Sequence, residues 1–561
     1  MTAAPASNDE TAAALLARGR EARARGAYPE AVPLLEAAVD RAHDDADAHY
    51  ELGLALAAQQ RWEDAIDHYV LAAHFAPARP EFREACAEAW LGAGDLAAAV
   101  AELDQLPPAE QARPMALFLR GACAKLAGDL AAACAAYGRA VAEAPARADF
   151  WCQLGYTQYL HGDYAAGRAS LERALTVQPS LPEAEHNLGL LSLETGTPAE
   201  ALERFRRADA ARPKTPEIVS ATGHALRDLG RLDDAIAAYD AALALAPAFG
   251  DAWINRCTTR LAQGDYARGW SEYEQRFTAT GTDAGSAGAP RWQGDPLNGR
   301  RLLIFGEQGL GDEIMFASCL PEALARAGAG VTIACDPRLA GLFARSFPAA
   351  TVVGHARGTA PLPAADLEIP IGSLPRLFRA SAVPATNRFL VADPARVEAW
   401  RHRLQSRQAG PWLALAWRGG SLRTRGHLRS AALTDCAPLL DGHPAVASAQ
   451  YGDVAADVAT LPVSTRARLH LFPETAGNLD EIAALLTAAG RVVTVDNTLA
   501  HLAGALGVPG CVLLPAAPEW RYPRSGERWP WYPFLRLVHW TAGGWPAAFA
   551  GAVHTLRTLA P

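Results

Sequence analysis

A 34-residue spacing constrains the first half of this 561-residue chain more than any other feature. Glycine or another small residue recurs once per period from Gly19 to Gly223, and a second series of glycines follows seven residues later, from Gly26 to Gly264. A fixed period of this length is typical of stacked helical hairpins. The spacing therefore predicts about eight hairpins between residues 12 and 276.

Each recurring position has a physical reason. The first small residue allows the two helices of a hairpin to approach, and the second glycine tolerates positive φ at the turn between them. Prolines from Pro77 to Pro247 mark the end of the second helix, because proline lacks an N–H and restricts the preceding residue. The third repeat has Ala87 in place of the first glycine, lacks the closing proline and contains Leu106-Pro107-Pro108, so we expect a local distortion there.

This pattern resembles the tetratricopeptide repeat over residues 12–276. The resemblance implies a concave groove for a protein or peptide, and a spacer or dimerisation arm is the alternative. Residues 1–11 are expected to be disordered, and the Gly/Ala/Ser-rich residues 277–299 are expected to be a linker.

The second half alternates short apolar runs with helical patterns, which predicts an α/β fold. A strand at 301–305, a glycine loop, a helix at 313–327 and a strand at 331–335 begin a Rossmann-like lobe over residues 300–391. A second such lobe is expected over residues 392–561. Its predicted strands lie at 412–417, 446–450, 492–495 and 511–514, and its predicted helices at 479–489, 499–506 and 546–559.

Charge and cysteine usage narrow the function. The net charge is −9, but residues 301–561 carry a net +5, which suits an anionic small ligand rather than a nucleic acid. Lysine occurs only at Lys125 and Lys214, so arginines must contact any phosphate. The nine cysteines include no C-x-x-C pair, so they are expected to be buried and reduced rather than bound to zinc or in disulfides, and no metal or cofactor is expected.

No run of 18 apolar residues occurs, and the N-terminus does not read as a signal peptide. We therefore expect no transmembrane segment and a cytoplasmic location.

Two strand-to-helix turns carry candidate site residues. Gly309, Gly311 and Asp312 follow the first strand, where Asp312 is either a helix cap or a carboxylate that deprotonates a hydroxyl. Asp496-Asn497-Thr498 follow the strand at 492–495, where they cap a helix or hold a diphosphate at its N-terminus.

Two further features lie nearby. His501 is one turn into the second helix and is either packed or functional. The loop from Arg418 to Arg429 concentrates arginines after a buried strand, either as a solvated basic loop or as a contact to a diphosphate or an acidic sugar.

The segments Gly309-Leu-Gly-Asp312 and Val492 to Pro509 resemble the heptosyltransferase family (glycosyltransferase family 9, GT-B fold). The resemblance implies that Asp312 is the general base on the acceptor hydroxyl. It also implies that Asp496, Asn497, Thr498 and His501 contact the donor's diphosphate and ribose, together with the glycine loop, and it places Arg418 and Arg429 at the phosphates.

The sequence thus predicts a metal-independent glycosyltransferase that moves a sugar from a nucleotide-sugar donor to an acceptor, a protein or peptide, chosen by the repeat groove. A catalytically inactive scaffold and an enzyme acting on a cell-envelope glycan are the alternatives. The O-linked N-acetylglucosamine transferase type also joins such repeats to a GT-B domain. Its ladder of groove asparagines is matched here only by Asn187 and Asn255.

Overall fold

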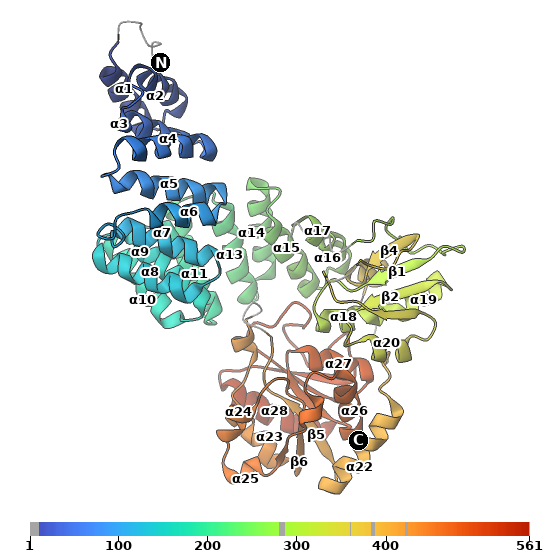
Figure 1. The fold of residues 1–561 in the computed structure, drawn as a ribbon. Helices are drawn as coiled ribbons and strands as arrows, with labels where there is room; N and C mark the ends of the chain where they lie inside the picture. The colour runs from blue at the N-terminus through green and yellow to red at the C-terminus, as the bar shows by residue number, and fades with distance from the viewer. Residues whose placement is uncertain (1–9, 280–285, 359–360, 383–387, 421–424, 560–561) are drawn as a thin grey trace. The chain divides into compact units, whose positions relative to one another are not determined.

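The chain forms two compact units in a computed structural model (Figure 1). One unit comprises residues 1–191 with 210–212, and the other comprises residues 192–209 with 213–561. The structure describes residues 10–279, 286–358, 361–382, 388–420 and 425–559. Of the segment expected to be disordered, residues 1–9 lie outside this description, and Thr11 caps the first helix.

Helical hairpins occupy residues 12–273, as the 34-residue period predicts. The helices are α1 Ala12–Ala24, α2 Tyr28–Arg41, α3 Ala46–Ala57, α4 Trp62–Phe75, α5 Pro80–Ala93, α6 Leu96–Asp104, α7 Pro114–Leu126, α8 Leu130–Glu143, α9 Ala148–His161, α10 Tyr164–Val177, α11 Pro182–Glu194, α12 Pro198–Ala211, α13 Pro216–Asp228, α14 Leu232–Leu245, α15 Gly250–Gln263 and α16 Tyr266–Tyr273.

The predicted roles of the repeated positions are confirmed where the structure tests them. A Cβ added at Gly53 would lie 2.6 Å from the ring of Tyr69, so only glycine allows α3 and α4 to pack this closely. Gly162 ends α9 in the left-handed conformation at φ 90°. Helix α4 ends two residues before Pro77 and α14 two residues before Pro247.

The third repeat is distorted, as expected. Helix α6 has 9 residues, whereas the second helices of the neighbouring hairpins, α4 and α8, have 14. The chain then turns at Leu106, whose side chain is buried in the core of this repeat. The two prolines that follow cannot supply the N–H groups that further helical turns would need.

Two all-parallel sheets form the α/β half. The first has the order β3-β2-β1-β4 and the second the order β10-β9-β8-β5-β6-β7. The strands are β1 Leu302–Phe305, β2 Val331–Cys335, β3 Thr351–Gly354, β4 Leu367–Pro370, β5 Trp412–Ala416, β6 Ala445–Ser448, β7 Leu469–His470, β8 Val492–Val495, β9 Gly510–Leu514 and β10 Leu535–His539.

Helices connect these strands. They are α17 Arg276–Ala279, α18 Leu310–Phe316, η1 Ala317–Cys319, α19 Leu320–Ala327, α20 Ala340–Ser346, η2 Ile371–Ser373, α21 Leu374–Phe378, α22 Pro394–Arg407, η4 Gly426–Arg429, η5 Leu433–Cys436, α23 Ala437–Gly442, α24 Ala455–Ala459, α25 Val463–Arg466, η6 Pro473–Thr475, α26 Leu479–Ala489, α27 Thr498–Leu506 and α28 Gly544–Thr558.

The central strands β1, β5 and β8 are buried on both faces. Along β5, Trp412 and Ala414 join one hydrophobic cluster, whereas Leu413 and Leu415 join another. Side chains alternate along a strand, so a strand covered on both faces reads as a continuous apolar run. The first cluster also contains Trp270 of α16, so the last hairpin shares a core with the α/β half.

Three predictions need correction. The single helix expected at 313–327 is divided into α18, η1 and α19, because Pro321 cannot donate a hydrogen bond within it. Within the expected linker, Trp292 is buried and its backbone N–H donates to Glu368 O at 2.9 Å, so residues 286–292 pack along β4. The last helix, α28, packs on the second sheet through Phe549 rather than across both lobes.

No helix in the described part of the chain has the length and hydropathy of a membrane span.

Candidate functional site

The second sheet reverses its winding between β5 and β8. If its strands are numbered from 1 to 6 in chain order, beginning with β5, they lie in the order 3-2-1-4-5-6. This is the strand order of a dinucleotide-binding fold. In such sheets a ligand binds beyond the carboxyl ends of the strands at the reversal. Arg418 to Gly420 follow β5 and Asp496 to Thr498 follow β8, so the sequence-predicted residues lie at this position.

Close packing holds the two loops together. A Cβ at Gly419 would lie 2.4 Å from the carbonyl oxygen of Asp496, so the approach requires glycine. The Asn497 side chain donates to Arg418 O at 3.0 Å and accepts from the N–H groups of Leu499 and Ala500. Asn497 is therefore the N-cap of α27 and a tie between the loops, and Asp496 is not a cap.

Asp496 is buried beside Arg429. The distance from Arg429 Nη1 to Asp496 Oδ2 is 3.2 Å. Burial raises the pKa of Asp496 above its ordinary value, although Arg429 opposes the shift. The structure thus brings together two of the predicted site residues as an ion pair.

Arg418 does not share this ion pair. Its side chain contacts Asp457 Oδ2 at 3.4 Å and donates to Asp453 O at 2.8 Å. It lines a cavity of about 340 Å³ at the ends of β5 and β6, together with Gly420 and Tyr451. Arg418 and Arg429 consequently contact different acidic segments of the chain.

The glycine loop of the first sheet packs on α27. A Cβ at Gly311 would lie 3.3 Å from the His501 ring and 3.5 Å from Thr498 Oγ1, so α18 approaches α27 closely at this residue. Gly309 is the N-cap of α18, and Asp312 lies in the first helical turn. Of the two alternatives that the sequence left open for Asp312, the helix cap does not apply, because the carboxylate pairs with Arg521.

His501 is fully enclosed by this packing. Its Nδ1 lies 3.3 Å from the hydroxyl of Tyr532, and its ring centroid is 5.3 Å from that of Trp529. Burial lowers the pKa of His501 well below 6.5, and Arg521 and Arg429 add to the shift. The imidazole is thus a neutral, packed group at pH 7.

Glu519 and Arg521, which follow β9, complete a row of alternating charges. Neither was predicted from the sequence as a site residue. Arg521 pairs with Asp312 and lies 3.9 Å from Glu519, and Glu519 lies 4.0 Å from Arg429. We call Asp312, Arg521, Glu519, Arg429 and Asp496 the charge row. Their position in the sequence could have indicated them, because Glu519 and Arg521 also follow the carboxyl end of a strand of the same parallel sheet.

A second unpredicted group lies at the reversal point of the first sheet, between β1 and β4. Arg276 pairs with Glu307 at 2.9 Å and donates to Ser373 Oγ at 2.9 Å. Tyr273 donates to Gln308 Oε1 at 2.8 Å. The chain that leaves the last hairpin therefore fills this reversal point with its own side chains.

The middle of the Arg418–Arg429 loop has a structural role. Arg425 contacts Asp228 Oδ2 at 2.7 Å and Leu193 O at 2.5 Å, and His427 lies 2.6 Å from Glu194 O. Residues 421–424 lie outside the described residues. Arg425 thus binds helices α11 and α13 rather than solvent or a diphosphate, whereas His427 is exposed, contacts α11 and also lines the cavity beside Arg418.

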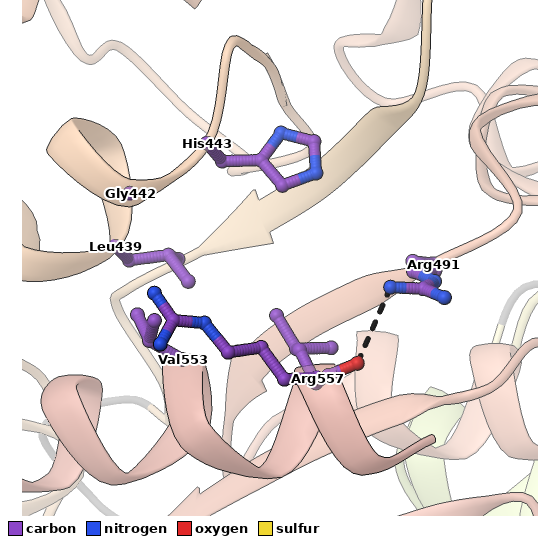
Figure 2. Close-up of a pocket in the computed structure, with 7 residues that line it drawn as sticks. Leu439, Gly442, His443, Arg491, Val553 and Arg557 are labelled. Atoms are coloured by element: carbon purple, nitrogen blue, oxygen red, sulfur yellow. Dashed lines mark hydrogen bonds between the residues drawn. The ribbon is translucent and has the colours of Figure 1, made fainter. Parts of the chain in front are cut away.

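A smaller cavity lies at the opposite edge of the second sheet (Figure 2). It has a volume of about 100 Å³, and its lining includes His443, Arg491 and Arg557. Arg491 donates to Leu556 O at 3.3 Å. None of the sequence-predicted site residues lines it. No group of three metal-ligating side chains occurs in the described ranges.

Known proteins are similar to parts of this chain. Residues 16–80, 152–216 and 220–284 match the tetratricopeptide repeat. The helical half is an array of tetratricopeptide repeats. Protein FlbA of Caulobacter vibrioides is 34% identical over 360 residues, which cover 59% of this chain and 60% of FlbA. The chain thus matches about three fifths of the length of this curated relative.

Solved structures with similar helices include the APC/C heterotetramer Cut9–Hcn1, with 14% identity, a TM-score of 0.40, and coverage of 48% of this chain and 53% of that chain. The MamA protein has 20% identity and a TM-score of 0.26, and covers 30% of this chain and 92% of its own. Similarity at these TM-scores carries no argument about function.

Proposed function

We propose that this protein is a glycosyltransferase that takes a sugar from a nucleotide-sugar and transfers it to an acceptor, a protein, selected by the repeat array. The observation that carries this proposal is the 3-2-1-4-5-6 order of the second sheet, with Gly419 and the N-terminus of α27 at its reversal point. A helix N-terminus beside a glycine loop favours a diphosphate.

The charge row supplies the proposed chemistry. A diphosphate at Thr498 would attract Arg429 and Arg521, because a guanidinium binds phosphate oxygens as well as it binds a carboxylate. Removal of Arg521 from Asp312 would leave that carboxylate free to accept a proton from the acceptor hydroxyl. The same exchange would leave Asp496 to contact the donor. Asn497 and His501 would hold the site in shape rather than touch the donor.

Repeats of this kind offer a surface to proteins, and the array has its own acidic character. The first half of the chain accounts for the whole negative net charge, since residues 301–561 are net positive. We therefore assign acceptor selection to the array and donor binding to the α/β half.

The test is calorimetric titration and thermal shift of the full chain with UDP, ADP, GDP and CMP and their sugar conjugates. A nucleotide at 100 times its Kd should stabilise the protein by about 2.7 kcal/mol. Arg429→Ala should lower the affinity for that nucleotide at least about tenfold, because one charge-assisted contact is lost. Arg557→Ala, at the opposite edge of the sheet, is the matched control and should bind as the parent does.

One observation favours a second candidate, a scaffold without catalysis. Both proposed functional carboxylates are already paired with arginines of the same chain, Asp312 with Arg521 and Asp496 with Arg429. A charge row that is only structural would bind none of the nucleotides, and Arg429→Ala would then lower stability alone. Absence of any nucleotide response would overturn the transferase proposal and favour the scaffold.

A further inference from the structure

A third cavity lies beside Arg521, on the side of the last hairpin. It has a volume of about 220 Å³ and is bounded by the turn between α15 and α16 and by the coil between β9 and β10. Gln263 and Tyr266 line it from the hairpin, and Trp520, Arg521 and Trp531 line it from the coil. All of these residues belong to one compact unit.

The aromatic walls are held by the core behind them. Trp270 is 1% exposed, and its ring centroid lies 5.6 Å from that of Trp520 and 6.3 Å from that of Trp531. Both contacts are close to perpendicular, the arrangement that aromatic quadrupoles prefer. The cavity is therefore preformed, and a ligand need not order its walls.

The charged wall connects the cavity to the charge row. The Arg521 guanidinium carbon lies 4.8 Å from the centroid of the Trp520 ring, and its Nη2 binds Asp312. Arg521 Nε is buried and has no hydrogen-bond partner among the described residues. A ligand in this cavity would consequently contact the residue that pairs with the proposed general base.

The chemistry of the lining selects the ligand class. Aromatic rings alternate with a guanidinium, an amide and a phenol, so neither a purely apolar side chain nor a free anion matches the whole surface. None of the five residues belongs to a strand, so a peptide cannot add to a sheet edge here. A pyranose ring matches both features, since its C–H face packs on aromatic rings and its hydroxyls bond guanidinium and amide groups.

We propose that this cavity binds a saccharide ring at the transferase site. The inference rests on the proposed function and names its substrate side: the ring is either the glycosyl group of the donor or a sugar already on the acceptor. In both cases it lies against Trp520 and Trp531, and its hydroxyls meet Arg521.

Saturation-transfer NMR tests this proposal. Methyl glycosides of hexoses and N-acetylhexosamines are titrated into the protein with and without saturating nucleotide. At least one glycoside should bind the parent chain at millimolar concentration. Ala262→Trp places a large side chain in the cavity and should lower the affinity for that glycoside at least about tenfold. Ala267→Trp, on the exposed side of α16, is the matched control and should leave binding unchanged.

Comparing nucleotide binding with glycoside binding distinguishes failure of the saccharide site from failure of the proposed function. A donor sugar predicts that a nucleotide-sugar binds the parent more tightly than its nucleotide does and that Ala262→Trp removes the difference. A sugar on the acceptor predicts glycoside binding that adds to nucleotide binding and is lost in Ala262→Trp.

Normal nucleotide binding with no glycoside binding would overturn the saccharide site and leave the transferase standing. Equal glycoside binding by parent and Ala262→Trp would place the ring elsewhere and also overturn the site. If Ala262→Trp fails to fold, Gln263→Ala takes its place, because Gln263 is exposed at the end of α15, where its Nε2 donates to Asp233 and its Oε1 accepts no hydrogen bond from the described residues. This variant lacks the amide that lines the cavity, so the affinity for the glycoside should fall by about threefold or more. Unchanged affinity would again contradict the proposal.

Discussion

Arg425 donates a hydrogen bond to Asp228 across 2.7 Å, although 197 positions separate the two residues in the chain. Arg425 adopts a left-handed backbone conformation at φ 53°, which is unfavourable for a residue with a side chain. Four residues later, Arg429 pairs with Asp496. The loop that carries Arg429 to the reversal point is therefore anchored on the last part of the repeat array.

Asp228→Asn should weaken this anchor. Burial alone would raise the pKa of Asp228, but His224, Arg227 and Arg425 together outweigh burial and lower it to about 2. The carboxylate thus stabilises the fold above its unfolded pKa of 3.8, and this contribution is lost as pH falls toward 2. At pH 7 we expect the free energy of unfolding to fall by about 2 kcal/mol or more.

Differential scanning calorimetry of the full chain between pH 3 and pH 7 measures this change in the second unit. Asp234→Asn, which loses an exposed pair with Arg231, should change stability by less than about 1 kcal/mol. Equal stability of the two variants would contradict the anchoring role.

Glu313→Gln should change the pH dependence in the opposite direction. Burial raises the pKa of Glu313 to about 7, although its bond from Asp336 N–H opposes the shift. The folded state thus favours the protonated acid, so stability is greatest below the unfolded pKa and is lost as pH rises through 7. The amide stays neutral, and at pH 8 the variant should be more stable than the parent by about 3 kcal/mol.

Urea denaturation at pH 5 and pH 8 measures the Glu313 effect. The difference between parent and variant should be larger at pH 8 than at pH 5. Glu398→Gln, exposed on α22, controls for the loss of a surface charge. A constant difference across this range would mean that Glu313 is ionised in the folded protein.

Asp312→Asn should abolish transfer while leaving nucleotide affinity within about twofold, because the amide fills the same space but accepts no proton. General base catalysis is typically worth 10²–10⁴ in rate. Turnover of the nucleotide-sugar identified by titration is the measurement. Loss of stability with retained turnover would show that the pair with Arg521 only holds α18 in place.

Truncation should distinguish the two parts of the array. A chain that begins at Pro182 retains the whole of α11 and of the second unit, and it keeps only residues 182–191 and 210–212 of the first unit, so it should fold and bind nucleotide. A chain that begins at Ala289 should fail to fold, because Trp270 leaves the shared core and Glu307 loses Arg276. Circular dichroism and nucleotide titration check both, and a folded Ala289 chain would show that the last hairpin is dispensable.

The repeats and most strands could be predicted because their signals are local. Small residues opposite Tyr69 or Tyr137 report helix contacts within one hairpin, and the run Trp412 to Trp417 reports a strand covered on both faces. Residues near the site could be placed for the same reason, since Asp312 and Asp496 each follow a predicted strand.

The partners of these residues could not be predicted, because they depend on long-range packing. Arg521 meets Asp312 across 209 positions, and Arg276 meets Ser373 across 97. The arginines of one basic loop look alike in sequence, yet Arg425 contacts the array and Arg429 contacts Asp496. Only the fold assigns them to different neighbours.

The place where the chain divides, between residues 191 and 192, bears on how such proteins diverge. Repeats in the first unit contact mainly their sequence neighbours, so duplication or deletion of a 34-residue block there disturbs one junction. The hairpins after residue 192 bear Asp228, Trp270 and Arg276, and a deletion there would remove side chains that the α/β half needs for its own core and loops. Descendants of a common ancestor should thus differ in repeat number at the amino-terminal side and keep the last repeats constant in number, a pattern that counting repeats in related genomes would reveal.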